Sequence, residues 1–358
     1  YTACVNIAYT PIPWRCSNII FLEKPGKKDK QDPRTYRPIS LTSFLFKTME
    51  RIILYNEDDT TFRNNPPNKN QHAFRKDHST ETALSAAIDN IEQGMIKGDF
   101  VIGLFLDIKG AFDCISPYKI IEALRMKGTS EIVINWYEQF LNNRTCQISM
   151  GGETINANLV IGTPQGICSS PGMGWSPGFD RLLHRWETQT ITKGTGYADD
   201  GQNTASGPDA DTVRLKAQHS LDIAVKWAAE HGLELCPKKT KVVIFSTRYK
   251  VPKVKPLILY GKPLEYSDEV KYLGITLDSK LSFKTHIDNK ISTAKRCLML
   301  AKYSLSQSWG PHPKYVKWAW TGVIRPSVTC VSLIWCKQTD SKTMQDKLKS
   351  LQRNALVL

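Results

Sequence analysis

Residues 100–107 read FVIGLFLD, an uninterrupted apolar run that ends at the carboxylate of Asp107. A run of this length, bounded by Asp99 and Asp107, predicts a β-strand that is covered on both faces. The end of such a strand lies at an edge of its sheet. Asp107 is therefore expected to face a crevice instead of the core.

A second acidic stretch, GYADD, occupies residues 196–200. An adjacent acid pair between short residues predicts a tight hairpin tip. Because neighbouring side chains in extended chain point to opposite faces, we expect Asp199 to point inward and Asp200 to point away. If the two strands are neighbours, Asp107 and Asp199 converge.

Two converging carboxylates repel each other unless they are protonated or share a cation. A Mg²⁺ ion is typically held by one or two carboxylates, while water and phosphate oxygens complete its coordination shell. A pair of such ions suits phosphoryl transfer. The residues alone leave a plainer interpretation open, because acid pairs are common in turns and an aspartate after a strand also suits the start of a helix.

The remaining pattern is mostly helical before and after this middle region. Caps and apolar periodicity predict helices that begin after Thr42 or Ser43, near Ser79 or Thr80, after Ser116, after Ser130 and near Asp209, and helix again from Phe283. After the segment GTPQG, the helix is expected to start only near Ser176 and Pro177. We also predict a hairpin at 144–160 and single strands at 242–245, 257–260 and 270–277.

The composition excludes some classes of protein. The 358 residues carry 48 Lys and Arg against 34 Asp and Glu, a formal charge of +14, and 41% of them are hydrophobic. This is a globular composition with no apolar run long enough to span a membrane, so no membrane partner is expected. The positive charge is spread over several clusters and suits a long polyanion such as nucleic acid, although a solvated lysine surface explains it equally well.

Further motifs extend the acidic pattern over nearly the whole chain. In order they are TYRPISLTS (35–43), QHAFRKDHST (71–80), FLDIKGAFD (105–113), GTPQG (162–166), GYADD (196–200), LCPKKTK (235–241), VKYLGITLD (270–278) and IRPSVTCVSLIW (324–335). In this order they resemble the reverse transcriptase of non-LTR, LINE-type retrotransposons. Two positions depart from the family pattern, with Ala73 where glycine is usual and Cys236 where asparagine is usual.

The resemblance implies an α+β fold of the right-hand polymerase type. Fingers would span 1–98, a palm with an antiparallel sheet backed by helices 99–279 (with finger elements near 129–160), and a helical thumb with a post-polymerase segment 280–358. It implies an RNA-directed DNA polymerase that uses two Mg²⁺ ions, with Mn²⁺ as an alternative, and works in target-primed retrotransposition. The implied partners are an RNA template, a DNA primer or target and dNTPs. Fusion to endonuclease or RNase H domains and work in the nucleus at the integration site are also implied.

The resemblance also implies roles for single residues. Asp107, Asp199 and Asp200 match the metal-binding acids, and Lys239 matches a proton donor to the leaving pyrophosphate or a plain phosphate contact. The implied dNTP site consists of Lys24, Arg37, Arg75, Phe112, Gln165 and Gly166, and the primer grip of Tyr272, Leu273 and Gly274. Phe112 would exclude a 2′-hydroxyl, although core packing also explains it. For Arg75 a structural ion pair is an equal alternative.

Two stretches depart from the family in a way that puts activity in question. Residues 167–178 contain three glycines and two prolines where an apolar helix is expected, and 201–207 (GQNTASG) offer little to bury where an apolar strand is expected. Such segments predict that the residues around the site pack too poorly to hold the catalytic side chains in place. One alternative is therefore a decayed, non-enzymatic RNA-binding remnant. A different polymerase, a group II intron maturase or an RNA-dependent RNA polymerase, is a further alternative. Trp318, Trp320 and Trp335 could stack on nucleic acid, but their helical spacing favours core packing.

Overall fold

The computed structural model describes residues 1–26, 29–248, 254–303 and 313–356, and about 52% of the chain is helical and 21% is strand. Its centre is a four-stranded sheet in the order β6–β7–β3–β8, in which every neighbouring pair is antiparallel. The strands are β3 (Phe100–Leu106), β6 (Lys193–Tyr197), β7 (Asp200–Gly207) and β8 (Lys241–Phe245). The antiparallel palm sheet that the sequence predicts is thus confirmed.

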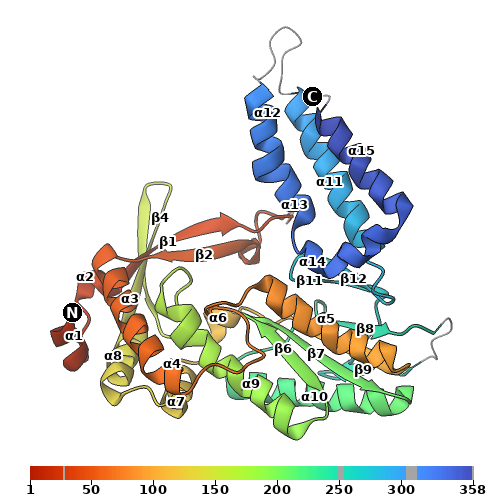
Figure 1. Ribbon diagram of the computed structural model, residues 1–358. Coiled ribbons are helices and arrows are strands. Elements are labelled where there is room, and N and C mark those ends of the chain that lie inside the picture. The colour runs from red at the N-terminus through yellow and green to blue at the C-terminus, as the bar shows by residue number, and fades with distance from the viewer. Residues whose placement is uncertain (27–28, 249–253, 304–312, 357–358) are drawn as a thin grey trace.

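All seven residues of β3 are buried, as the apolar run predicts. Helices α9 (Ser176–Gln189) and α10 (Ala210–Glu230) cover one face of the sheet, and α5 (Thr80–Ile96) covers the other (Figure 1). Side chains of β3 alternate between these layers, so Ile102 and Leu104 belong to one core cluster and Val101 to the other. Two covered faces explain why the strand has no polar face.

Strand β7 corrects the expectation that 201–207 cannot support the sheet. It is an inner strand, paired with β6 on one side and β3 on the other, and six of its eight residues are buried. Its polar side chains bind one another and their surroundings. The Gln202 amide donates to Thr204 at 2.6 Å, and the Asn203 amide donates to Thr192 at 3.0 Å. The amide nitrogens of Gln202 and Asn203 are thus hydrogen-bonded inside the sheet, whereas their oxygens, Gln202 Oε1 and Asn203 Oδ1, are buried without a hydrogen-bond partner.

A second sheet, in the order β2–β1–β4–β5, lies beside the first (Figure 1). It comprises β1 (Cys16–Glu23), β2 (Tyr36–Leu41) and the predicted hairpin, β4 (Arg144–Met150) and β5 (Glu153–Leu159), which is confirmed. The other elements of this half are helical: α1 (Thr2–Asn6), α2 (Ile12–Arg15), η1 (Pro33–Thr35), α3 (Phe44–Asp59), α4 (Thr61–Asn64), α6 (Ala111–Cys114), α7 (Pro117–Lys127) and α8 (Glu131–Asn142). Gly128, in the left-handed conformation, ends α7 as predicted.

The segment 270–277 forms a hairpin and not the single strand predicted from its apolar pattern. Leu273 and Gly274 both have positive φ, which is the geometry of a two-residue hairpin turn. The hairpin comprises β11 (Glu269–Tyr272) and β12 (Ile275–Asp278), and a smaller one precedes it, β9 (Leu257–Leu259) and β10 (Lys262–Leu264). A leucine at positive φ gives no sequence signal for such a turn.

Helices of the C-terminal part stand together above the central sheet (Figure 1). They are α11 (Lys284–Tyr303), α12 (Pro313–Ala319), η3 (Trp320–Ile324), α13 (Arg325–Thr329), α14 (Ser332–Trp335), η4 (Cys336–Asp340) and α15 (Lys342–Leu356). Trp335 is buried and Trp320 packs partly against the core, but Trp318 is 67% exposed, so core packing was the wrong prediction for Trp318. Within the described residues, no helix is both long and apolar enough to cross a membrane.

Gly94 sets the distance between α5 and the central sheet. A Cβ atom at Gly94 would lie 2.5 Å from Val101 Cγ2 and 3.1 Å from Ser206 Cβ. We expect Gly94→Leu to lower the free energy of unfolding by about 2 kcal/mol, because overpacking outweighs the better helix propensity. Urea titration measures this, with Ser85→Leu on the exposed face of the same helix as the control. Equal stability of the two variants would contradict the close packing.

Candidate active site

Three acids meet at one edge of the central sheet. Leu106 of β3 pairs with Gly201 of β7, so Asp107 and Asp200 lie next to each other at the ends of the two strands. The predicted hairpin tip is confirmed, since Tyr197 pairs with Asp200 across a turn formed by Ala198 and Asp199. We call residues 197–200 the acid turn. Acids that are about ninety positions apart in sequence are thus brought together by strand pairing.

The charges of the three carboxyls act on one another. Burial raises the pKa of Asp199, and the Asp107 charge raises it further. The pKa of Asp200 is raised to about 6, first by burial and then by the charges of Asp199 and Asp107. Asp200 keeps access to solvent, so its desolvation is only partial. Asp199 lies in the turn and Asp200 is the first residue of β7, and the charges of Asp199 and Asp107 act on Asp200. The direction of the Asp200 side chain relative to a metal ion stays a prediction.

Two cationic side chains accompany the acids. Lys239 Nζ lies 3.3 Å from Asp107 Oδ2, and its charge, like that of Arg37 on β2, acts on Asp199 to lower its pKa. The loop that carries Lys239 is fixed to the strand end, because the Cys236 N–H donates to the Asp107 carbonyl at 2.8 Å. Lys239 and Arg37 thus bring positive charge next to the acids, where it could bind phosphate groups.

The donor set suits a hard divalent cation that binds together with a substrate. Among the residues that the structure describes, no group of three or more His, Cys, Asp or Glu side chains is close enough to form a metal cage. Mg²⁺ commonly needs no such cage, since one or two carboxylates with water and substrate phosphates complete its octahedron. The mutual repulsion of Asp107, Asp199 and Asp200 is what a cation would relieve.

The predicted nucleotide residues Phe112, Gln165 and Gly166 come together beside the acids' strand. Gln165 Nε2 donates to Asp113 Oδ1 at 2.7 Å, next to Phe112 on α6. The Ser40 N–H of β2 donates to the Gln165 carbonyl at 2.7 Å. Gly166 has φ +104°, and a Cβ there would lie 3.1 Å from Ile39 Cγ2, so only glycine fits against β2 without strain.

Lys24 and Arg75 have different surroundings. Lys24 follows β1. Burial raises the pKa of Asp113, and the Gln165 hydrogen bond and the Lys24 charge only partly offset this, which places Lys24 near the Gln165–Asp113 pair. Arg75 does not join the acids: its Nη1 donates to the Asn68 carbonyl at 3.1 Å, and its charge acts on Asp180. The hydrogen bond of Arg75 ends on a backbone carbonyl, and the ion partner of Asp180 is Lys127, so both the ion-pair role and the triphosphate role of Arg75 stay predictions.

The predicted primer-grip residues lie at the β11–β12 turn. Tyr272 is 5% exposed and its ring is 5.2 Å from that of Phe105 on β3. Burial raises the pKa of Tyr272, and the Asp200 charge raises it further, so this turn is a neighbour of the acids. Leu273 and Gly274 form the turn itself, and their role toward a primer stays a prediction.

The glycine-rich stretch 167–178 is folded and closely packed, contrary to the predicted erosion. Glu50 of α3 is fully buried and accepts from the Cys168 and Ser169 N–H groups. Residues Ser170–Trp175 then form a π-helix that leads into α9 at Ser176, where the sequence predicts the helix to start. The backbone N–H groups at the start of this stretch are thus satisfied by a buried carboxylate.

Three residues near the site were missed by the sequence reasoning: Glu50, Asp113 and Trp175. Asp113 closes the FLDIKGAFD motif, so its motif position was a usable signal. Glu50 lies among apolar positions of α3, and a charged residue on an apolar helix face is also a signal. Trp175 gave none, because its role depends on contacts formed only in the fold.

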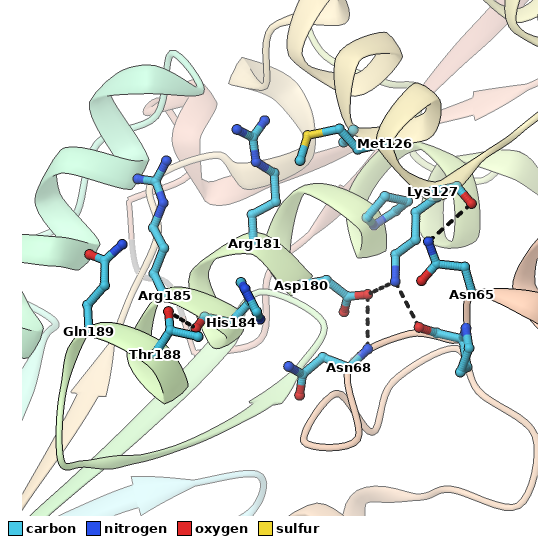
Figure 2. Close-up of a pocket in the computed structure, with 13 residues that line it drawn as sticks. Asn65, Asn68, Met126, Lys127, Asp180, Arg181, His184, Arg185, Thr188 and Gln189 are labelled. Carbon is cyan, nitrogen blue, oxygen red and sulfur yellow. Dashed lines mark hydrogen bonds and ion pairs between the residues drawn. The ribbon is translucent and has the colours of Figure 1, made fainter.

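A cavity of about 540 Å³ lies away from the acids, between α7 and α9 (Figure 2). Its cations are each paired with an acid. Lys127 Nζ lies 2.9 Å from Asp180, Arg181 donates to Glu122 at 2.8 Å and Arg185 to Glu230 at 2.6 Å. Because these charges are already balanced, the cavity offers structural ion pairs and not a free phosphate site.

The family model described as reverse transcriptase (RNA-dependent DNA polymerase) matches residues 24–277. The chain belongs to the reverse transcriptase family. The matched range includes Asp107, the acid turn and Lys239, so the edge of the palm sheet is the candidate polymerase site of this reverse transcriptase domain. Members of the family use divalent metal ions.

Curated relatives confirm the non-LTR type. The chain is 26% identical, over its full length and 34% of the relative, to a 115 kDa protein of the type-1 retrotransposable element R1DM of Drosophila melanogaster. It is 29% identical, over 81% of its length and 32% of the relative, to the RNA-directed DNA polymerase from mobile element jockey of the same fly. The chain spans about a third of the length of these relatives.

Solved structures confirm the fold. Telomerase from Candida albicans, in complex with a fragment of telomeric RNA, matches with a TM-score of 0.55 at 11% identity, over 97% of this chain and 64% of that one. A telomerase from Candida tropicalis matches with a TM-score of 0.53 at 10% identity, over 96% and 55%. At such low identity the likeness concerns the fold of the reverse transcriptase domain.

The raised pKa of Asp200 predicts a pH-dependent stability. A carboxyl whose pKa is about 6 when folded and 3.8 when unfolded favours folding fully below about pH 4, and this contribution is lost as the pH rises to about 6. Asp200→Asn has no ionisable carboxyl, so it does not lose this stability as the pH rises. Allowing for solvent screening, we expect a gain of ~1 kcal/mol or less at pH 7.5 and none at pH 4.

Thermal unfolding at the two pH values measures this effect, with Asp89→Asn on the exposed face of α5 as the control. An equal gain in stability for Asp200→Asn at both pH values would show that burial and the neighbouring charges do not destabilise the ionised carboxyl.

Proposed function

We propose that this chain synthesises DNA on an RNA template, extending a DNA 3′-hydroxyl with dNTPs for a non-LTR retrotransposon. The observation that carries the proposal is the meeting of Asp107 and the acid turn at one sheet edge, with Lys239 and Arg37 beside them. Carboxylates next to cations are the arrangement that nucleotidyl transfer requires, since the first hold divalent ions and the second bind phosphate.

In this proposal Asp107 and Asp199 hold Mg²⁺, of which two ions take part, and Mn²⁺ is the alternative ion. When bound, the ions lower the charge repulsion between the 3′-oxygen and the triphosphate. Asp200 completes the acid cluster from β7. Arg37 faces the triphosphate, and Lys239 Nζ, now held by Asp107 at 3.3 Å, donates a proton to the leaving pyrophosphate. Lys24 lies near Asp113 and is a further candidate for a phosphate contact.

Phe112 is the proposed sugar gate. It is partly exposed on α6, beside the Gln165–Asp113 pair, and its ring rests against Trp175 at 5.5 Å. A ring supported from behind cannot yield to a 2′-hydroxyl, so a ribonucleotide is excluded by shape. Gln165 and Gly166 would lie against the new base pair, and residues 272–274 would hold the primer end.

The wider setting belongs to the same proposal. We infer that the template is the RNA of the element, that the primer is a nicked chromosomal target, and that the reaction takes place in the nucleus. Because the relatives are about three times longer, we also infer that the polymerase is fused to further domains of the endonuclease or RNase H type.

The polymerase proposal predicts primer extension on poly(rA)–oligo(dT) by the purified chain with Mg²⁺ and dTTP. Asp199→Ala is expected to lower the rate by about a thousandfold or more, because the ligand that positions the reacting charge is lost. Asp346→Asn, at an exposed position of α15, is the control and should match the wild type.

Wild type and Asp199→Ala being equally inert would contradict the polymerase proposal. Salt-sensitive RNA binding that persists in the inert protein would then favour a non-enzymatic RNA-binding remnant.

The gate proposal predicts that Phe112→Ala lowers the preference for dTTP over UTP by roughly tenfold or more, because removing the ring opens space for a 2′-hydroxyl. Single-nucleotide incorporation with each substrate measures the ratio of the two kcat/KM values. Phe179→Leu, in the same aromatic core but further from the surface, controls for general loosening. Unchanged sugar selectivity in Phe112→Ala would exclude the gate role.

A further inference from the structure

We propose that Trp175 is a positioning residue of the polymerase site, which fixes the acid turn through its indole N–H and supports Phe112 with its ring. This inference rests on the proposed function and adds a residue to its machinery. Trp175 belongs to the stretch 167–178 that the sequence reasoning interpreted as eroded.

The first support is a hydrogen bond to the acid turn. Trp175 Nε1 donates to the Ala198 carbonyl at 2.7 Å. That carbonyl and the amide nitrogen of Asp199 share one planar peptide unit, so the bond fixes the plane from which Asp199 continues. Ala198 has φ +55°, a left-handed conformation that costs an alanine about 1 kcal/mol. A turn held in an unfavourable conformation needs such an external contact to persist.

The second support is the aromatic contact on the other side of the ring. The Trp175 ring centroid lies 5.5 Å from that of Phe112 and 5.8 Å from that of Phe179. Trp175 itself has no exposed surface, whereas Phe112 is partly exposed. A single buried side chain therefore contacts both the turn that carries the acids and the ring proposed to select the sugar.

The π-helix explains how this tryptophan reaches both partners. A Cβ at Gly174 would lie 2.9 Å from Thr163 Oγ1 and 3.2 Å from the Tyr137 hydroxyl, so glycine lets the π-helix approach the 162–166 segment closely. Thr163 in turn donates its N–H to the Phe112 carbonyl at 2.7 Å. Single-turn π-helices are frequent at functional sites because they redirect side chains. Gly174 thus serves the close packing that directs Trp175.

The same protein supplies a matched control. Trp186 is also fully buried, and its Nε1 donates to a backbone carbonyl, that of Ser220, at 3.0 Å. Its bond ends on α10 and not on the acid turn. Trp186→Phe therefore removes the same kind of hydrogen bond from the same kind of environment without touching the acids or Phe112.

The test compares Trp175→Phe, Trp175→Ala and Trp186→Phe in primer extension by the full 358-residue chain. Trp175→Phe keeps an aromatic ring but loses the donor, so we expect kcat to fall about tenfold or more, KM for dTTP to change less than about threefold, and sugar selectivity to stay. Trp175→Ala also removes the support of Phe112, so selectivity for dTTP over UTP should fall about fivefold or more. Trp186→Phe should keep kcat within about twofold at equal or greater loss of thermal stability.

A second readout does not require activity. Deuterium uptake of peptides that cover residues 196–201 should be faster in Trp175→Phe than in Trp186→Phe. Equal kcat values for these two variants, or equal uptake in the acid turn, would overturn the positioning role. Retained sugar selectivity in Trp175→Ala would overturn the support of Phe112. If the wild type incorporates no nucleotide, the proposed function fails, and hydrogen exchange alone decides whether Trp175 fixes the turn.

Discussion

The antiparallel pairing of β3 with β7 is the interaction on which the site depends. It unites Asp107 with the acid turn, although about ninety residues separate them in the chain. The pairing is stable because both faces of the sheet are covered, by α9 and α10 on one side and by α5 on the other. The close approach of like charges at the strand ends is thus imposed by a buried sheet, which is how a fold can hold groups that repel each other.

The surroundings of the acids are organised around the same edge. Lys239 is fixed by a loop whose backbone is bonded to Asp107, and Arg37 arrives from the second sheet. The 162–166 segment joins the two sheets, since Gln165 bonds to Ser40 of β2 through its backbone and to Asp113 of α6 through its side chain. The site is therefore built between the two sheets, and neither sheet alone contains all of its predicted parts.

Much of the fold could be predicted from sequence wherever a local sequence pattern determines the element. The apolar run of β3, the caps of α5 and α7 and the hairpin at 144–160 are local signals, and the order of motifs indicated the family and the acids. Prediction failed where tertiary contacts determine the burial or the conformation of a residue. The amide nitrogens of Gln202 and Asn203 find hydrogen-bond partners inside the sheet, and Leu273 takes a positive φ because a hairpin turns there. The register of β3 with β7 places Asp200 next to Asp107. Trp175 belongs to the same class.

We propose that Asp107 and Asp199 jointly hold a divalent cation. The direct measurement is a Mn²⁺ titration, followed by the electron paramagnetic resonance of the free ion, on wild type, Asp107→Asn, Asp199→Asn and the double variant. If the two carboxylates share the cation, each single substitution weakens Mn²⁺ binding about tenfold or more. The fold-loss of affinity in the double variant is then clearly smaller than the product of the two single fold-losses. Unchanged binding in either single variant, or fully independent losses, would contradict it.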